Sequence, residues 1–280
     1  MEFLEKLENG STNIKRMGIV KALFVMFLSI LLEVFGQVPV EITNLFSGNY
    51  EKIVPYVIFV FGVLVKYYVV IILIKWLSNE SEDSNLSNYL NLTSFAYATF
   101  MIIGFRMIFD NSLNLWISTI SMPQFINEVF NGDTVSPIIS IFSTIVIAPI
   151  YEEIIFRGIL LRGMARKISP NIALLVSALL FAVVHMNIAQ GINAFFLGIV
   201  LGLIYLRSGS IYLSIFAHFI NNLMALLVTS SFSSIAVKYP LEIHGIFLAI
   251  GMIFLAITCF GHNKNRSKNR LNIYKEFLKM

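Results

Sequence analysis

Eight long apolar runs, separated by short polar stretches, are the feature of this sequence that most limits its fold. The runs cover residues 17–42, 53–77, 92–109, 135–156, 170–189, 191–207, 211–229 and 241–260. A membrane-spanning helix needs roughly 20 mostly apolar residues, which is close to the length of each run. Strands of a membrane barrel would alternate apolar and polar residues, whereas these runs are continuous. The sequence therefore predicts an all-α, polytopic transmembrane helix bundle of about eight spans.

Composition supports the same class. Of the 280 residues, 57% are hydrophobic and 13% are charged, whereas soluble domains carry about a quarter charged residues. A single cysteine, Cys259, excludes a small disulfide-stapled secreted module. The net charge of +4 does not indicate a nucleic-acid partner, because the basic residues stand at the ends of apolar runs. We expect one integral membrane domain, residues 1–280, whose surroundings are the lipid bilayer.

The distribution of Lys and Arg predicts the orientation of the bundle. The loop 110–134 contains neither residue, whereas the tail 261–280 is strongly basic. With the N-terminus inside, the basic residues before the tail that also lie inside are Lys6, Lys15, Arg16, Lys75, Arg162, Arg166, Lys167 and Arg207. By the positive-inside rule both termini are expected in the cytoplasm. The abundance of Ile, Asn and Lys is typical of an AT-rich bacterial genome, so a bacterial cytoplasmic membrane is the expected location.

Two mixed segments are expected to lie along the membrane surfaces. Residues 115–130 are apolar but interrupted, and they place Trp116 where it suits the outer headgroup region. Residues 157–168 intersperse arginines among apolar residues, so this segment should continue the fourth span and turn its basic side to anionic lipid at the inner surface.

Three charged residues are scattered over the first three spans. Charged groups inside hydrocarbon are costly and need a partner or a wet cavity. Lys66 lies near the middle of its run, and Glu33 is a candidate partner for it. Arg106 is close enough to a span end for its long side chain to reach the interface. For these three residues a structural role is expected.

The remaining polar residues gather on spans four to seven. Glu152 and Glu153 are neighbours about 100° apart on a helix, so one can face a cavity while the other pairs with Arg157. Phe181 and His185 are four residues apart, so the phenylalanine ring can wall the pocket that holds the imidazole.

A second imidazole and an amide stand on span seven. His218 and Asn222 are also four residues apart and can project to one point, although Asn221 could take the place of Asn222. If one straight helix covered 170–189, His185 would lie roughly 22 Å beyond Pro170, deeper than Glu152 and His218. This difference in depth requires either that the helix begins inside the cytosol or that the bilayer thins.

Such a set of side chains suits amide hydrolysis by water. A carboxylate and an imidazole can deprotonate a water, and a second imidazole with an amide can stabilise the oxyanion. Neither Ser214 nor Cys259 is placed as an obvious nucleophile. Glu152, His185 and His218 could instead bind zinc, although the usual H-E-x-x-H pattern is absent. A reaction without a cofactor is favoured, and a metal-dependent one remains an alternative.

Three motifs on these spans carry a family resemblance. EEIIFR at 152–157, FAVVH at 181–185 and HFINN at 218–222 resemble the motifs of the CAAX protease and bacteriocin-processing family of intramembrane proteases. The resemblance covers 135–228, a third of the chain, which would be the catalytic core. It implies a helix bundle around a membrane-embedded polar cavity that is open to the cytosol and to lipid.

The resemblance also implies roles. Glu152 and His185 would activate the water, and His218 and Asn222 would stabilise the oxyanion, with Glu153 and Arg157 in support. The expected function is an intramembrane endopeptidase acting on a membrane-associated or hydrophobic peptide or protein. Two other classes were weighed: a non-catalytic scaffold that regulates another membrane protein, and a transporter. Transport is disfavoured because no matching pair of Gly/Pro-broken spans is seen.

Overall fold

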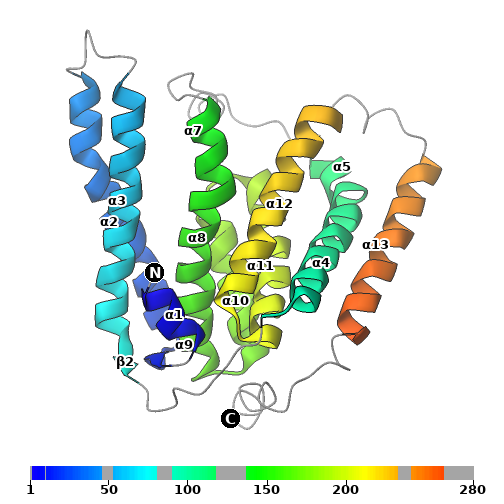
Figure 1. Ribbon diagram of the computed structural model, residues 1–280, viewed down its shortest axis with the longest axis horizontal. Helices are drawn as coiled ribbons and strands as arrows, with labels where there is room; N and C mark the ends of the chain where they lie inside the picture. The colour runs from blue at the N-terminus through cyan, green and yellow to red at the C-terminus, as the bar shows by residue number, and fades with distance from the viewer. Residues whose placement is uncertain are drawn as a thin grey trace.

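The computed structural model describes residues 2–9, 11–45, 53–80, 90–117, 137–232 and 241–261 (Figure 1). The expected basic tail beyond 261 and the surface segment from 118 onward lie outside these residues. The helices are α1 (Glu2–Glu8), α2 (Ile19–Leu45), α3 (Val54–Leu77), α4 (Leu92–Asp110), α5 (Leu113–Ile117), α7 (Pro137–Phe142), η2 (Ser143–Ile147), α8 (Ala148–Glu153), η3 (Ile154–Leu161), α9 (Arg162–Ala165), α10 (Pro170–Val183), α11 (Ile188–Ser208), α12 (Ile211–Phe232) and α13 (Leu241–Gly261).

The predicted all-α polytopic bundle is confirmed. Within the described ranges, six helices are long and apolar enough to cross a membrane, if the continuous rod from α7 to α9, Pro137–Ala165, is taken as one helix. α10 and the first part of α12, Ile211–Leu227, are shorter apolar helices. The fourth apolar run thus continues to Ala165, nine residues beyond its predicted end at 156.

The prediction of one continuous span over 170–189 is wrong, because the helix ends before residue 184. α10 ends at Val183, and Met186 adopts a left-handed backbone conformation with φ of 50°. Asn187 then begins α11, because its side chain accepts hydrogen bonds from the backbone N–H groups of Ala189 and Gln190. An N-cap residue behind a left-handed residue separates two helices within one apolar run. His185 therefore lies in a turn between helices.

The motif helices occupy the middle of the molecule. In Figure 1, α2 and α3 form a hairpin at one side and α13 lies at the other, with α4 beside it. Between them, α10 packs against α11 and η3, while α12 packs against α4, α8 and η2. The rod from α7 to α9 and the helices α10–α12 thus surround the residues singled out above.

A small sheet closes one end of the bundle. β1 (Thr12–Ile14) pairs antiparallel with β2 (Ser78–Glu80), with Asn13 opposite Asn79. Because β2 follows α3 directly, the pairing joins the segment before α2 to the end of α3. We call this end of the molecule the sheet end.

The expectation that the basic side of 157–168 faces lipid is wrong. Arg157 is buried, and Arg162 donates to the Leu7 carbonyl at 2.9 Å and to Asn13 Oδ1 at 3.0 Å. Arg166 donates to the Ile14 carbonyl at 2.5 Å. Backbone carbonyls of the N-terminal residues thus take the place expected for lipid headgroups, because arginine donates several hydrogen bonds in one plane.

Candidate active site

Two π-helical segments flank the short helix that carries both glutamates. In η2 the Ala148 N–H donates to the Ser143 carbonyl, five residues back. Because the Ala148 N–H bonds to Ser143 and not to Thr144, the Thr144 carbonyl is available to another partner. It accepts a hydrogen bond from Asn222 Nδ2 at 2.9 Å. In η3 the Phe156 carbonyl accepts from Ser177 Oγ at 3.0 Å. π-Helical turns occur often at functional sites, and here each one presents a backbone acceptor to a neighbouring helix.

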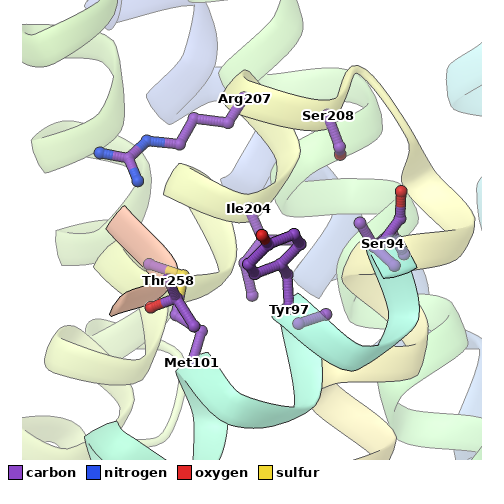
Figure 2. Close-up of a pocket in the computed structure, with 9 residues that line it drawn as sticks. Ser94, Tyr97, Met101, Ile204, Arg207, Ser208 and Thr258 are labelled. Atoms are coloured by element: carbon purple, nitrogen blue, oxygen red, sulfur yellow. The ribbon is translucent and has the colours of Figure 1, made fainter. Parts of the chain in front are cut away.

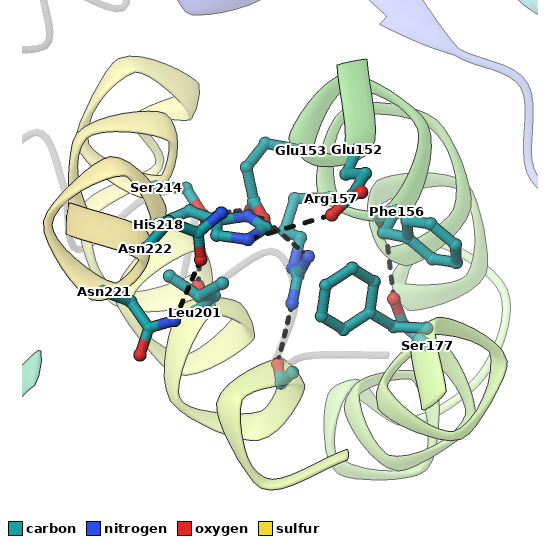
Figure 3. A network of polar contacts seen from close by, with 12 residues as sticks. Glu152, Glu153, Phe156, Arg157, Ser177, Leu201, Ser214, His218, Asn221 and Asn222 are labelled. Carbon is teal, nitrogen blue, oxygen red and sulfur yellow. Dashed lines mark hydrogen bonds and ion pairs between the residues drawn. The ribbon is translucent and has the colours of Figure 1, made fainter. Parts of the chain in front are cut away.

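Glu153 is the centre of a buried polar network (Figure 3). Its side chain is 0% exposed, and its carboxylate accepts from Arg157 Nη1 at 2.7 Å, Ser214 Oγ at 2.6 Å and His218 Nδ1 at 2.9 Å. These three donors satisfy most of the acceptor capacity of the carboxylate. The prediction that one glutamate would pair with Arg157 is thereby met by Glu153.

Arg157 connects this network to α10 and α11. Its Nη2 donates to the Gly198 carbonyl at 3.1 Å, and its guanidinium carbon lies 4.7 Å from the centre of the Phe181 ring. Arg157 is 1% exposed, and a buried charge needs a partner. The Glu153 carboxylate and the face of the Phe181 ring balance the positive charge of its guanidinium group. Phe181 also contacts Phe156, with ring centres 5.0 Å apart. The Glu153–Arg157 ion pair of the rod is thus contacted by residues of α10, α11 and α12.

Glu152 lies on the other side of His218. Its Oε2 is 3.8 Å from His218 Nε2, and its side chain is 24% exposed, whereas His218 is 3% exposed. Because a carboxylate accepts and does not donate, Nδ1 of His218 carries the hydrogen of its bond to Glu153. Nε2 is thereby directed to Glu152. The separation exceeds a direct hydrogen bond and matches a contact that one water can bridge.

His185 reaches the site through Phe181. Its Nδ1 donates to the Phe181 carbonyl at 2.7 Å, and its ring centre is 4.9 Å from that of Phe181. The Phe181 ring also contacts His218, with ring centres 5.8 Å apart. Both histidines thus contact the Phe181 ring, although His185 lies 15 residues beyond Pro170 at the start of α10. In the described structure no hydrogen bond or ion pair joins His185 to Glu152.

The two asparagines of α12 differ in their surroundings. Asn221 is 2% exposed and donates to Asn222 Oδ1 at 3.0 Å, while its own Oδ1 is buried without a partner in the described part of the chain. Asn222 is held at both ends, by Asn221 and by the Thr144 carbonyl. It also lines a cavity of about 680 Å³ between α7–η2 and α12. Asn222, and not Asn221, therefore lines an open space.

The three residues considered as zinc ligands do not converge. The Nδ1 bonds, from His185 to a carbonyl and from His218 to Glu153, leave Nε2 of each ring as the nitrogen that could bind a metal. Among the described residues, no group of three His, Cys, Asp or Glu side chains is placed to hold a metal ion. The arrangement of Glu152, His185 and His218 therefore does not fit a metal bound by all three.

Ser214 belongs to the site in a role that the sequence did not reveal. It lies one turn before His218 and was considered only as a nucleophile. In the structure it is 0% exposed and donates to Glu153. Its spacing of four residues from His218 was the available signal, because such residues share a helix face.

The predicted partnership of Lys66 and Glu33 is confirmed. The Lys66 ammonium contacts the Glu33 carboxylate, and it lies 4.7 Å from the centre of the Tyr151 ring. Because Tyr151 directly precedes Glu152, the Lys66 ammonium links the α2–α3 hairpin to the rod from α7 to α9. Arg106 pairs with Asp110 at 2.9 Å, as a structural role predicts.

Replacing Lys66 with methionine should lower the free energy of unfolding by about 1–2 kcal/mol, because Glu33 loses its counter-charge at a half-buried position. The double variant Glu33→Leu/Lys66→Met should recover most of this loss. Thermal unfolding of the purified protein in detergent measures both. A double variant no more stable than Lys66→Met would show that the ion pair is not the source of the effect.

A second pocket lies away from these residues. It has a volume of about 340 Å³ and lies between α4, α11, α12 and α13 (Figure 2). Its lining is mostly apolar, with Arg207 at one side and the hydroxyls of Ser94 and Thr258. None of the residues predicted for catalysis lines it.

Comparisons with known proteins bear on the same region. Residues 134–224 match the family model described as type II CAAX prenyl endopeptidase, Rce1-like. A curated relative, the candidate membrane peptidase YdiL of Bacillus subtilis (strain 168), is 28% identical over 159 residues. That match covers 55% of this chain and 64% of the relative. No solved structure gives a significant match.

The family model spans the rod from α7 to α9 and helices α10, α11 and most of α12. It therefore contains Glu152 and Glu153, which contact His218, and Arg157, His185 and His218, which contact the Phe181 ring. Residues 134–224 are thus similar to the Rce1-like CAAX proteases, and both comparisons support a protein of the CAAX protease family.

Proposed function

We propose that this protein is an intramembrane endopeptidase that hydrolyses a peptide bond of a membrane-associated or hydrophobic peptide. The observation that carries the proposal is the position of Glu152. Its partly exposed carboxylate faces His218 Nε2 at 3.8 Å, while the fully buried Glu153 holds the opposite ring nitrogen. One carboxylate thus orients the histidine and the other is left to react, an arrangement suited to general base catalysis.

In the proposed reaction Glu152 accepts a proton from a water molecule as the water oxygen attacks the peptide carbonyl carbon. His185 supports this step from the α10–α11 turn. Its Nδ1 hydrogen is committed to the Phe181 carbonyl, so Nε2 of the neutral ring carries a lone pair that can hold the water. The roles of both residues follow the family resemblance, and the hydrogen bond of His185 determines which nitrogen carries the hydrogen when the ring is neutral.

His218 and Asn222 are proposed to stabilise the oxyanion that forms on the carbonyl oxygen. One amide hydrogen of Asn222 is used by the Thr144 carbonyl, which leaves the second for the oxyanion. His218 contributes through Nε2 when both ring nitrogens are protonated, with Glu153 accepting the hydrogen of Nδ1. Donors held in place before the reaction need no reorganisation in the transition state.

Cleavage is completed when the C–N bond breaks and the proton on Glu152 moves to the departing nitrogen. The second proton of the water passes from the new carboxylic acid to the amine, so the products are a carboxylate and a protonated amine, and Glu152 returns to its ionised form. No metal is assigned a role, because the three expected ligands do not converge. Glu153, Arg157, Ser214 and Phe181 support the reacting groups without touching the substrate.

The proposal is tested by mapping protein termini in membranes and secreted peptides by mass spectrometry. A deletion strain carries either the wild-type chain or Glu152→Ala. Termini that appear only with the wild type establish proteolysis and identify a substrate. Identical termini, together with a preserved phenotype, would contradict the proposal and favour a non-catalytic scaffold.

A further inference from the structure

The residues before α2 form a built interface with the catalytic rod. Residues 2–9 and 11–17, here called the N-terminal segment, lead up to the first residue of the first apolar run and lie outside the matched family domain. Leu7, Ile14 and Met17 of this segment are 2%, 0% and 0% exposed. A segment that only lay on the surface would not bury its apolar side chains so completely.

Two glycines of the rod provide the space for this burial. A Cβ atom at Gly158 would lie 3.1 Å from Leu7 Cδ2, and one at Gly163 would lie 2.9 Å from Met17 Cγ. Both distances are below ordinary van der Waals contact, so a side chain at either position would require the Leu7 or Met17 side chain to shift. The Met17 N–H also donates to the Gly163 carbonyl at 3.0 Å. Together with Arg162 and Arg166, these contacts attach the segment to η3 and α9.

The same segment reaches the helix that carries His218. Oε2 of Glu8 accepts from the backbone N–H of Ile211 at 2.8 Å, at the first residue of α12. Ser210 Oγ satisfies a second N–H of that turn, the one on Leu213, at 3.2 Å. A helix begins with unpaired N–H groups and a partial positive charge, both of which a carboxylate stabilises. Glu8 thus caps α12 from a position 203 residues away in sequence.

We propose that the N-terminal segment is a clamp that sets the distance between the two halves of the active site, with Glu8 as its positioning residue. The rod carries Glu152 and Glu153, whereas α12 carries Ser214, His218 and Asn222. At the sheet end, the segment bonds to both helices through Arg162 and Ile211. The 3.8 Å spacing between Glu152 and His218 depends on the placement of these helices. This inference rests on the proposed endopeptidase function for its catalytic consequence, but not for its structural one.

The structural consequence is measured by hydrogen–deuterium exchange of the full chain in detergent. Glu8→Ala should raise the exchange rate of the first-turn amides of α12, residues 211–214, about fivefold, the effect of losing one helix cap. Glu5→Ala is the matched control, because Glu5 lies on the same helix with its side chain exposed. Unchanged exchange in Glu8→Ala would overturn the proposal whether or not the protein is a protease.

The catalytic consequence is measured on a synthetic peptide that spans a terminus mapped with the wild type. Glu8→Ala should lower kcat per folded molecule about tenfold with KM changed less than twofold, as expected for misplaced catalytic groups. Glu8→Gln keeps an acceptor oxygen and should restore most of the activity, while Glu5→Ala should behave as wild type. An unchanged kcat in Glu8→Ala, or no recovery in Glu8→Gln, would overturn the clamp. Raised exchange in Glu8→Ala, together with a wild-type protein that cleaves nothing, would instead contradict the endopeptidase function alone.

Discussion

Glu152→Gln should lower kcat for peptide cleavage by about a thousandfold, because an amide cannot accept the proton of the attacking water. Glutamine has nearly the same shape, and the closest ion-pair contact of Glu152 among the described residues is the long one to His218 at 3.8 Å, so the packing around it should be retained. KM should change little, since the carboxylate is proposed to act on water and not on the substrate. Steady-state kinetics on a mapped substrate peptide would measure both constants.

The matched control for this experiment is Glu242→Gln. Glu242 lies in the first turn of α13 with its side chain exposed and outside the family domain, so it should leave both constants unchanged. Size-exclusion profiles and thermal unfolding would establish that the two variants fold equally. A Glu152→Gln protein that cleaves at the wild-type rate would remove Glu152 from the mechanism.

Arg157→Met should have the largest effect on stability, lowering the free energy of unfolding by about 3–5 kcal/mol. The substitution leaves Glu153 with a negative charge at 0% exposure and removes the donor to the Gly198 carbonyl. Burying a charge without its partner is among the most unfavourable changes available in a protein interior. Accumulation in the membrane and thermal unfolding in detergent would report the loss.

A second variant separates the charge from the packing. In Glu153→Gln/Arg157→Met the unbalanced charge is gone, so the double variant should unfold at a higher temperature than Arg157→Met. It should still be inactive, because glutamine holds His218 less firmly than a carboxylate. Equal unfolding temperatures for the single and the double variant would show that packing, and not charge, dominates at this position.

The candidate site was largely predictable because its residues are exceptions to a strong pattern. Glu152, Glu153 and Arg157 stand out in an apolar run, and their spacing on a helix already suggested that one carboxylate pairs with the arginine. The structure identifies that carboxylate as Glu153. The pairing of Lys66 with Glu33 was predictable for the same reason, since an intramembrane charge needs a partner.

Sequence alone determined the class of the fold, the approximate helices and the motif residues, because hydrocarbon admits few structures and makes each polar residue conspicuous. Tertiary structure decided the rest. It ended α10 at Val183, placed Ser214 on Glu153, and gave Arg162 and Arg166 the N-terminal segment as partner in place of lipid. These outcomes depend on hydrogen-bond partners that are distant in sequence, and hydrophobic periodicity reports which face is buried but not which groups meet there.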